Sequence, residues 1–287
     1  MINKSIAITG ANGFIGSNLK EYFLVKGFRV KCFQRPKPLV YEPSVSYVRY
    51  DLELPLSTDD FLNIDILIHC AYTPYSIKCE NADEINAIAT ARIIEMCRQH
   101  MIKIIFLSSF SAHSSTRSHY GMNKLALEKM FDEKRDLIFK LGLVVGNGGM
   151  FLKMKELLDN KYIIPLIDNG KQLVQTIGMP DLLEIFNVAI DKGITGIYNV
   201  AEERPRSLKN ILLIIRNKEA RNLFIPISSS LLLKILKITE RIGILLPFSS
   251  ESVLGLKWGK IYKTANDLNT FGIIAKSLEE ITANNDL

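Results

Sequence analysis

A glycine-rich segment close to the N-terminus, Thr9-Gly10-Ala11-Asn12-Gly13-Phe14-Ile15-Gly16, constrains this chain most. It follows a short apolar run, Ser5–Thr9, and leads directly into a segment of helical period, Phe14–Lys26. Glycines in this spacing let the backbone turn sharply and approach a pyrophosphate, whose charge then lies on the N–H groups at the start of the helix. Glycine-rich turns are common, but this place between strand and helix favours dinucleotide binding over a purely structural turn.

Beyond this turn, short β-branched runs alternate with longer segments of helical period as far as about residue 200. Such alternation predicts a parallel sheet that helices cover on both faces. We therefore expect an α/β fold with a doubly wound (Rossmann) sheet. The predicted strands are Ser5–Thr9, Arg29–Gln34, Val45–Tyr50, Ile64–Cys70, Ile102–Ser108, Leu137–Val145 and Gly196–Val200. The predicted helices are Phe14–Lys26, Asp83–Gln99, Tyr120–Glu133, Met150–Asn160, Pro180–Asp191 and Leu208–Asn217.

The alternation weakens after about residue 201, which predicts a smaller C-terminal substrate lobe interwoven with the first domain. We expect residues 1–146 and 174–200 to form the nucleotide-binding domain, and residues 147–173 and 201–287 to form the lobe. Near its end, Ser277-Leu278-Glu279-Glu280 fits a capping box and predicts one last short helix.

The most hydrophobic stretch of the chain, Ser228–Phe248, lies in this lobe. Lys234, Lys237, Glu240 and Arg241 interrupt it, so it falls short of the ~18 uninterrupted apolar residues that a bilayer-spanning helix needs. We expect an amphipathic helix that packs in the lobe. A helix that lies on a membrane surface is the alternative.

The net charge of +6 suits anionic partners such as phosphorylated cofactors, nucleotide-linked substrates or an anionic membrane surface. The basic residues are spread along the chain without a recognisable nucleic-acid motif, so we expect no nucleic-acid binding. The four cysteines form no CxxC pair and have no clustered histidines beside them, which argues against a metal site and for free thiols. The N-terminal apolar run is too short for a signal peptide, so a cytoplasmic location is expected.

The residue at the end of the second predicted strand bears on the choice of cofactor. NAD-specific enzymes place an acid there to bind the ribose 2′-hydroxyl, whereas this chain has Gln34-Arg35. A cation suits a 2′-phosphate, so the sequence favours NADP over NAD. The alternative is that Arg35 simply faces solvent.

Ser109, Tyr120 and Lys124 form a second motif, with Tyr120 and Lys124 in a YxxxK spacing. Residues four apart share one face of a helix, so the Lys124 ammonium can lie near the Tyr120 phenol. We expect that cation to lower the pKa of Tyr120 from ~10 towards the neutral range, where a phenol serves as general acid or base. Ser109, at the end of a predicted strand, is placed to hold the reacting oxygen by a hydrogen bond.

With both motifs in place, the sequence resembles the extended short-chain dehydrogenase/reductase superfamily, and within it the NAD-dependent epimerase/dehydratase family. The similar segments are TGANGFIG, Tyr50-Asp51-Leu52, Ile68-His69-Cys70-Ala71, Asn86, Leu107-Ser108-Ser109, YGMNK, residues 141–146 and Asp181-Leu182. The likeness is strong over roughly residues 3–200 and faint beyond them.

The resemblance implies that Tyr120 is the general acid/base, that Ser109 assists it, and that Lys124 also binds the nicotinamide ribose. It implies that Asp51 and Leu52 flank the adenine, that Ala71 lies along the nicotinamide, and that the protein is a homodimer. With the turn and the cation, the expected cofactor contacts are Gly10, Asn12, Gly13, Phe14, Ile15, Gly16, Arg35, Asp51, Leu52, Ala71, Tyr120 and Lys124.

Several positions depart from the family pattern. Phe110-Ser111 stands where sugar 4,6-dehydratases of the family carry an Asp-Glu pair, so dehydration is disfavoured. Lys140-Leu141 replaces an Arg-Pro of many relatives, and Gly178 replaces a histidine. Arg117 and the nearby histidines, His113 and His119, lie in a short loop where they could touch substrate, although we expect both histidines to be solvated.

Three functions compete. The first is an NAD(P)-dependent oxidoreductase that reduces a keto group of a nucleotide-linked sugar, with Tyr120 as general acid, in nucleotide-sugar metabolism and polysaccharide biosynthesis. The second is a nucleotide-sugar 4-epimerase that keeps its NAD bound. The third, which is not an enzyme, is a dinucleotide-binding scaffold or sensor.

Overall fold

The computed structural model describes residues 4–35, 44–217, 219, 221–244, 246 and 248–283. The chain forms two compact units, each built from several segments. The first unit comprises Met1–Ser108, Leu125–Phe139 and Phe186–Tyr198. The second comprises Ser109–Lys124, Lys140–Ile185 and Asn199–Leu287.

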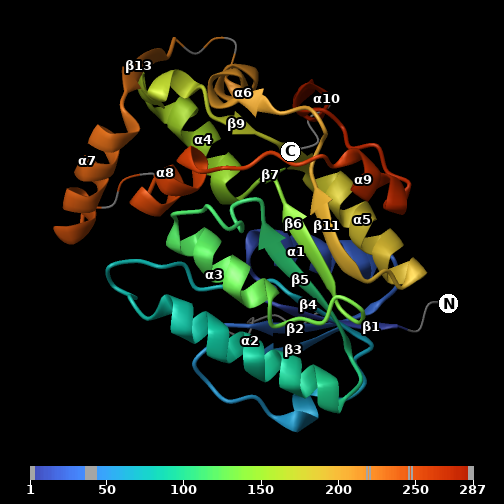
Figure 1. The fold of residues 1–287 in the computed structure, drawn as a ribbon. Coiled ribbons are helices and arrows are strands. Elements are labelled where there is room, and N and C mark those ends of the chain that lie inside the picture. The colour runs from blue at the N-terminus through green and yellow to red at the C-terminus, as the bar shows by residue number, and fades with distance from the viewer. Residues whose placement is uncertain are drawn as a thin grey trace. The chain divides into compact units, whose positions relative to one another are not determined.

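A seven-stranded sheet, in the order β11-β6-β5-β4-β1-β2-β3, forms the centre of the first unit (Figure 1). Neighbouring strands from β3 to β5 pair in parallel. The strands are β1 (Ser5–Thr9), β2 (Arg29–Gln34), β3 (Val45–Arg49), β4 (Ile66–His69), β5 (Lys103–Ser109), β6 (Leu137–Leu141) and β11 (Gly196–Val200). This topology confirms the predicted doubly wound α/β fold. Because β1 lies between β2 and β4, the strand order reverses beside the glycine-rich turn, where open α/β sheets bind ligands.

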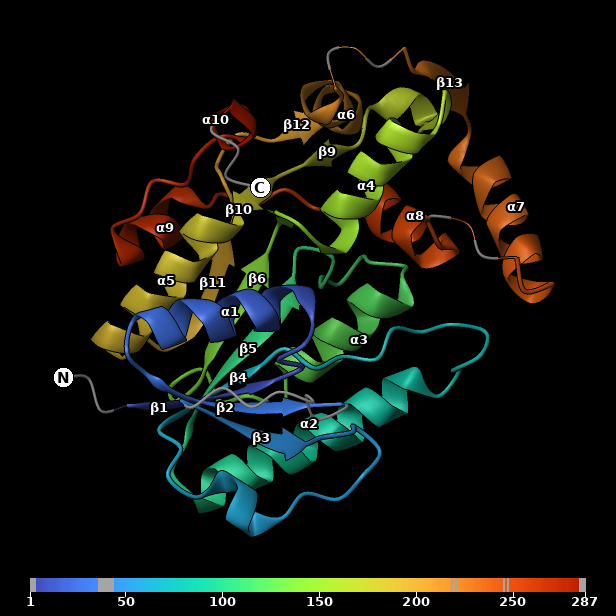
Figure 2. The same ribbon diagram turned by 180° about the vertical axis from the view of Figure 1, so that it is seen from behind.

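Helices α1 (Phe14–Val25) and α2 (Ala82–Gln99) cover opposite faces of this sheet (Figure 2). In α1 the buried residues Gly16, Leu19 and Phe23 are three and four positions apart, so a single face of the helix meets the sheet. A 3₁₀ turn, η1 (Thr58–Phe61), precedes β4.

Helix α3 spans His119–Glu128 and is shorter than the predicted Tyr120–Glu133. After Glu128 the backbone makes tighter bonds, with the N–H of Met130 donating to Leu127 and that of Phe131 to Glu128. This turn places Phe131 in the core, where its ring stacks on Phe106 with 4.6 Å between centroids. The helical period of the sequence continues beyond Glu128, so the predicted helix is longer than the one that packing allows.

The sequence predicted one strand over Leu137–Val145, but the structure has two strands there. It breaks at Gly142 into β6 and β7 (Leu143–Val145), and β7 pairs in parallel with β10 (Thr176–Gly178). A Cβ at Gly142 would lie 2.6 Å from the carbonyl oxygen of Gln175. Only glycine allows that approach, and the strand changes sheets there.

The second unit surrounds a core formed by α4, α6 and α10 with short strands. Its elements are α4 (Gly149–Asn160), β8 (Ile163–Ile167), η2 (Asp168–Gly170), β9 (Leu173–Val174), β12 (Arg206–Ser207), α6 (Leu208–Ile215), β13 (Leu223–Ile227), α7 (Ser229–Arg241), α8 (Ser250–Lys257), α9 (Ala265–Phe271) and α10 (Leu278–Ala283). Helix α5 (Met179–Lys192) has residues in both units. The predicted capping box is confirmed, because Ser277 N–H donates to Glu280 Oε2 (2.7 Å) and Glu280 N–H donates to Ser277 Oγ (3.3 Å).

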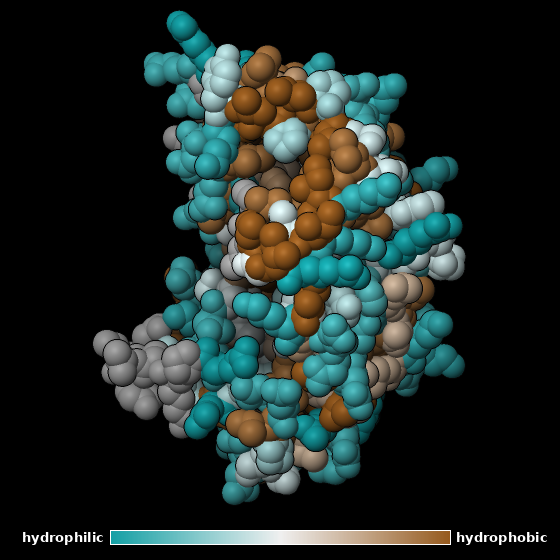
Figure 3. Space-filling view, turned by 90° about the vertical axis from the view of Figure 1, so that its left-hand side faces the viewer, coloured by the Kyte–Doolittle hydropathy of each residue, from teal (hydrophilic) through white to brown (hydrophobic). Residues whose placement is uncertain are grey.

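The predicted amphipathic helix of Ser228–Phe248 is present as α7, and Leu245 and Pro247 lie outside the described residues. Ser228 caps this helix by accepting a hydrogen bond from the N–H of Leu231 (3.2 Å). None of the helices in the described ranges has the length and apolar character that a bilayer crossing requires. The outer face of the second unit that carries α7 is strongly apolar (Figure 3).

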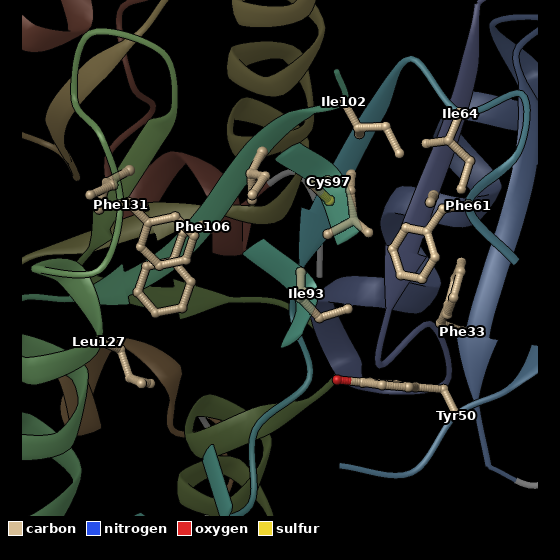
Figure 4. Packing of buried hydrophobic residues seen from close by; sticks show 14 residues of the cluster. Phe33, Tyr50, Phe61, Ile64, Ile93, Cys97, Ile102, Phe106, Leu127 and Phe131 are labelled. Carbon is tan, nitrogen blue, oxygen red and sulfur yellow. The ribbon is translucent and has the colours of Figure 1, made fainter. Parts of the chain in front are cut away.

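Aromatic rings fill much of the core of the first unit (Figure 4). Phe33 meets Phe61 with ring centroids 5.4 Å apart and meets Tyr50 edge-on at 6.0 Å. Because Phe33 belongs to β2 and Tyr50 follows β3, this cluster fixes the carboxyl ends of two strands beside the glycine-rich turn.

Candidate functional site

The glycine-rich turn follows β1 in the first unit. Gly10 has a φ of +64°, its N–H donates to the Phe33 carbonyl (2.8 Å), and its own carbonyl accepts from Gly13 N–H (2.9 Å). A Cβ at Gly16 would lie 2.3 Å from the Gly10 oxygen, so the start of α1 rests directly on the turn. Gly10 needs a left-handed backbone and Gly16 needs close contact, which only glycine supplies without strain.

The start of α1 suits an anion. Gly13 occupies the N-cap and offers no side-chain cap, and the first turn of the helix contains no acidic residue. The backbone N–H groups and the positive end of the helix dipole therefore face the turn without a competing carboxylate from the helix. Asn12, Phe14 and Ile15 complete this edge. This cradle fits the pyrophosphate of a dinucleotide.

Ala71 lies against the same turn, just beyond the end of β4. Its N–H and that of Cys70 both donate to Thr9 Oγ1 at 3.1 Å, and a Cβ on Gly10 would come within 3.0 Å of Ala71. Thr9 Oγ1 also lies 2.7 Å from Nδ1 of the buried His69. His69 therefore supports the backbone at the switch point.

Asn86, on α2, holds the segment after Ala71. Its amide accepts from Thr73 N–H (2.9 Å) and donates to the Thr73 carbonyl (2.7 Å), and its side chain is buried. The family-like asparagine is therefore a backbone clamp in this structure.

Arg35 and Asp51 form an ion pair at the carboxyl ends of β2 and β3, with 2.9 Å between Nη1 and Oδ2. Asn12 Nδ2 donates to the Arg35 carbonyl at 2.8 Å, which links this pair to the turn. Desolvation acts to raise the pKa of Asp51, but the hydrogen bond from Arg35 and the N–H of Glu53 outweigh it and lower that pKa. Arg35, which we expected either to bind a 2′-phosphate or to face solvent, is thus paired with a carboxylate. Leu52, next to it, packs against the aromatic core.

The predicted acid–base residues lie in the second unit, at the end of β5 and on α3. The phenol of Tyr120 forms a side-chain hydrogen bond with Ser109, whose Oγ also accepts from Ser111 N–H at 3.2 Å. Lys124 is buried and, four residues after Tyr120 in α3, shares its helix face. The structure therefore joins Ser109 and Tyr120 directly and holds Lys124 on the same helix.

Tyr120 does not have the lowered pKa expected from Lys124. Burial is the largest influence and raises the pKa of the phenol, and the hydrogen bond with Ser109 opposes it. A raised pKa favours the neutral phenol, which is the form that donates a proton.

Three residues that the sequence did not single out position α3. A Cβ at Gly121 would lie 2.2 Å from the Ser111 carbonyl, and the Gly121 N–H is capped by Ser118 Oγ (3.0 Å). The Tyr120 N–H donates to the carboxylate of Glu251 on α8, at 3.3 Å. Glu251 lies 131 residues away in the chain, so no local pattern could have linked it to Tyr120.

The loop between Ser109 and Tyr120 is less exposed to solvent than we expected for its histidines. His113 is buried instead of solvated, with Nε2 2.7 Å from the Trp258 carbonyl and Nδ1 3.1 Å from Ser115 Oγ. Arg117 lies over the Trp258 ring, 4.4 Å from its centroid, while His119 is half-buried. His113 and Arg117 thus fasten this loop to the end of α8.

Neighbouring family positions also have structural partners. The Lys140 ammonium is buried and donates to the Ala112 carbonyl, and the Phe110 ring packs on Tyr262 with centroids 4.7 Å apart. A Cβ on Gly178 would come within 2.9 Å of the Ile281 Cδ1 methyl, so Ile281 would have to shift to admit a larger residue. Within the described ranges, no group of three His, Cys, Asp or Glu side chains is arranged to hold a metal ion.

The comparisons with known proteins agree with this architecture. The model of the NAD dependent epimerase/dehydratase family matches residues 6–201, well over half of the chain. A UDP-glucose 4-epimerase from Vibrio cholerae is 22% identical over 219 residues, which are 63% of this chain and 65% of that protein. The aligned part thus spans slightly less than two thirds of that relative.

Two solved structures resemble nearly the whole chain. MoeE5 in complex with UDP-glucuronic acid and NAD has a TM-score of 0.72 and 19% identity, covering 97% of this chain and 96% of that one. Pal from Bacillus thuringiensis has a TM-score of 0.73 and 14% identity, covering 98% and 97%. At these identities the likeness establishes a common fold.

Proposed function

The chain belongs to the NAD-dependent epimerase/dehydratase family, and from this membership we propose that it is a nucleotide-sugar 4-epimerase that works with NAD. The observation that carries the proposal is the hydrogen-bonded Ser109–Tyr120 pair, followed by the buried Lys124. Phe110 and Ser111 offer no carboxylate beside it, which disfavours water elimination. The epimerase from Vibrio cholerae, similar in sequence, supports this choice over a reductase.

Residues of the first unit, together with Lys124 of α3, would hold the cofactor. Gly10, Gly13 and Gly16, with Asn12, Phe14 and Ile15, would surround the pyrophosphate at the start of α1. Asp51 and Leu52 would flank the adenine, Ala71 would lie along the nicotinamide, and Lys124 would bind the nicotinamide ribose. Bound NAD would supply the acceptor and donor of the hydride, while the protein orients it.

NAD is the cofactor that we propose in place of NADP. Arg35 is the residue that favours a 2′-phosphate, but its guanidinium is held by Asp51 at 2.9 Å. The similar solved structure of MoeE5 contains NAD. A surface ion pair of this kind contributes only ~0–1 kcal/mol, so Arg35 keeps NADP available as the second candidate.

Tyr120 would carry the proton in both directions of the epimerisation. It would take the proton from the sugar hydroxyl during oxidation and return it to the keto oxygen during reduction, while Ser109 holds that oxygen by a hydrogen bond. Because burial raises the pKa of Tyr120, the basic form needs nearby positive charge when substrate is bound. Lys124, on the same helix face, would provide it.

The two predicted domains would divide the cofactor and the substrate between them. Residues 1–146 and 174–200 would bind the nucleotide cofactor, and residues 147–173 and 201–287 would bind the nucleotide sugar.

The four free cysteines suit the cytoplasm. Exposed apolar residues on α2 and α3, Ile88 and Met122, suit the proposed homodimer.

Cofactor content and turnover test the proposal together. Purified protein should release close to one NAD per chain on gentle denaturation, and it should interconvert a UDP-hexose and its 4-epimer, followed by proton NMR, without added cofactor. UDP-glucose, UDP-N-acetylglucosamine and UDP-glucuronic acid are the first substrates to use. The exposed Tyr162→Phe variant serves as a control that keeps the activity.

The second candidate, an NADP-dependent reductase of a keto-sugar nucleotide, predicts a different result. It rests on Arg35 and on the lack of an acid at the end of β2. Such an enzyme would purify without dinucleotide and would consume NADPH in proportion to a 4-keto nucleotide sugar. That outcome would replace the epimerase proposal.

A further inference from the structure

Helix α7 exposes a continuous apolar stripe. Leu231, Ile235, Ile238 and Ile242 are 52%, 39%, 60% and 65% exposed, and they follow one another at intervals of four, three and four residues. This spacing places all four on one face of the helix and its C-terminal end. Scattered exposed apolar residues are normal on a protein surface, but a full helical stripe is not.

The stripe is not the face by which α7 packs in its own unit. Leu236, buried to 3% exposure, projects from a different side of the helix. Glu240, the one acidic residue of α7, accepts hydrogen bonds from the Ser250 N–H (2.7 Å) and hydroxyl (2.8 Å) at the start of α8. Helix α7 therefore has one buried face that holds it in place and a second apolar face that the described residues of its unit leave exposed.

Three cations flank the exposed stripe. Lys234, Lys237 and Arg241 are three and four residues apart, so they line a neighbouring face of α7, and all three are exposed. The engagement of Glu240 with Ser250 leaves this surface of α7 apolar and positive. Long basic side chains beside an apolar stripe can extend their charges away from it, as they do at a membrane interface.

The apolar surface continues from α7 onto the two-stranded sheet before it. Ile163 on β8 and Leu223 on β13 are register partners, and with Ile225 they are 54%, 48% and 43% exposed. Figure 3 shows the apolar side chains as a band over β13 and α7, with hydrophilic side chains along its edge. A hollow next to Leu246 is lined by Lys153 and Lys161 together with Glu156, so its charged lining has one more cation than anion.

We propose that this face of the second unit, made of α7, β8 and β13, binds the surface of a bilayer that contains anionic lipids. The apolar stripe would enter the boundary between headgroups and acyl chains, while Lys234, Lys237 and Arg241 contact lipid phosphates. A 13-residue helix lies in the plane of such a surface. The net charge of +6 adds long-range attraction to it.

The charges favour a bilayer over a second copy of this chain. A symmetric dimer places the same patch on both subunits, so the basic rims of two α7 helices would meet each other. Like charges in contact oppose that association, whereas an anionic surface complements every cation of the rim. Membrane binding is independent of the epimerase reaction and can fail or succeed without it.

Vesicle co-sedimentation tests the proposal with the full chain. Binding is expected to vesicles of phosphatidylcholine and phosphatidylglycerol at 3:1, to fall as NaCl is raised, and to be at least tenfold weaker to pure phosphatidylcholine. Replacing Ile238 and Ile242 together by glutamate should abolish binding. The triple variant K234Q/K237Q/R241Q should weaken it strongly, at about fivefold per cation removed.

Ile274→Glu, at a site that is 93% exposed away from the stripe, is the matched control and should bind like the parent. Circular dichroism spectra and thermal midpoints identical to those of the parent establish that the variants are folded. Equal loss of binding in the control, or no binding to anionic vesicles by the parent, overturns the proposal. Self-association without vesicles that I238E/I242E removes, measured by analytical ultracentrifugation, would assign the stripe to a second copy instead.

Discussion

At the scale of single residues, burial is the largest influence on the pKa of Tyr120, the proposed proton-transfer group. Tyr120 has a raised pKa because its phenol is desolvated, and the opposing influence is a hydrogen bond from a residue at the end of a strand. Ser109 thus lowers the pKa of Tyr120, in addition to the role that we propose for it in holding the substrate oxygen. The sequence identified both residues, but it assigned the control of the pKa to Lys124.

Tyr120→Phe removes the proton donor while it leaves the ring in place. We expect kcat to fall by about 10²–10⁴-fold, the usual contribution of general acid–base catalysis. The content of bound NAD should stay that of the parent, because the glycine-rich turn is unchanged. Loss of NAD together with activity would show that the substitution disturbs the fold and not the proton transfer alone.

Ser109→Ala tests the pKa directly. Removing the hydrogen bond that opposes burial should raise the pKa of Tyr120 further. When Tyr120 acts as a base, the rate rises as pH passes through this pKa, so the profile of kcat/KM for the variant should move to higher pH. A profile that falls in amplitude without moving would contradict this role.

Gly16→Ala probes the contact between α1 and the turn. The new Cβ would lie 2.3 Å from a backbone oxygen, which cannot swing away as a side chain would. We expect the free energy of unfolding to fall by about 1–3 kcal/mol, measured by urea denaturation, and the bound NAD to be lost. Gly259→Ala, whose Cβ would meet nothing closer than 3.4 Å, should leave both unchanged.

At the scale of elements, local signals predicted the starts of helices better than their ends. The capping box at Ser277 placed α10 correctly, whereas α3 ended early because Phe131 was needed in the core. Strands β8 and β13 are not among the predicted strands, and each carries a proline, Pro165 or Pro226, which is atypical of a central strand. A two-stranded sheet has only edges, and proline is tolerated there.

Ser277→Ala should destabilise the second unit by about 1 kcal/mol, the usual cost of losing an N-cap. Leu278 and Ile281 of α10 are buried in the core of that unit. Fraying at the start of the helix should therefore lower the free energy of unfolding. The measurement is the urea midpoint. Ser230→Ala, at an exposed position that is not a cap, should change it little, and an equal shift in both variants would argue against the capping role.

At the scale of the whole molecule, charged clusters tie distant segments of the second unit together. The buried Arg206 pairs with Glu202 and with Glu279 on α10, which joins residues more than seventy positions apart. The hydrogen bond from Arg206 is the main reason that the pKa of Glu279 is lowered.

A lowered pKa fixes the direction of the pH dependence. Glu279 stabilises the folded state above its unfolded pKa of about 4.5, and this contribution is lost as pH falls through the lower folded value. Glu279→Gln should therefore lower the thermal midpoint at pH 7, and the difference from the parent should shrink as the pH falls below about 4. Glu219→Gln, which removes the same charge at an exposed position, is the matched control.

The sequence by itself determined the doubly wound fold, the glycine-rich turn and the pairing of Ser109 with a YxxxK helix. These depend on residues that are neighbours in the chain, where turn chemistry, helical period and strand ends are local properties. It also singled out Ser228–Phe248 as an amphipathic stretch that either packs in the second lobe or lies on a membrane surface.

Only the tertiary structure decided which distant groups meet. The ion pair of Arg35 with Asp51, the carboxylate of Glu251 at the start of α3, and the burial of His113 against Trp258 all depend on the path of the chain. So does the pKa of Tyr120, because desolvation is set by everything packed around the phenol. The same holds for α7, since a sequence shows that a helix is amphipathic, but only packing decides which apolar face is left exposed.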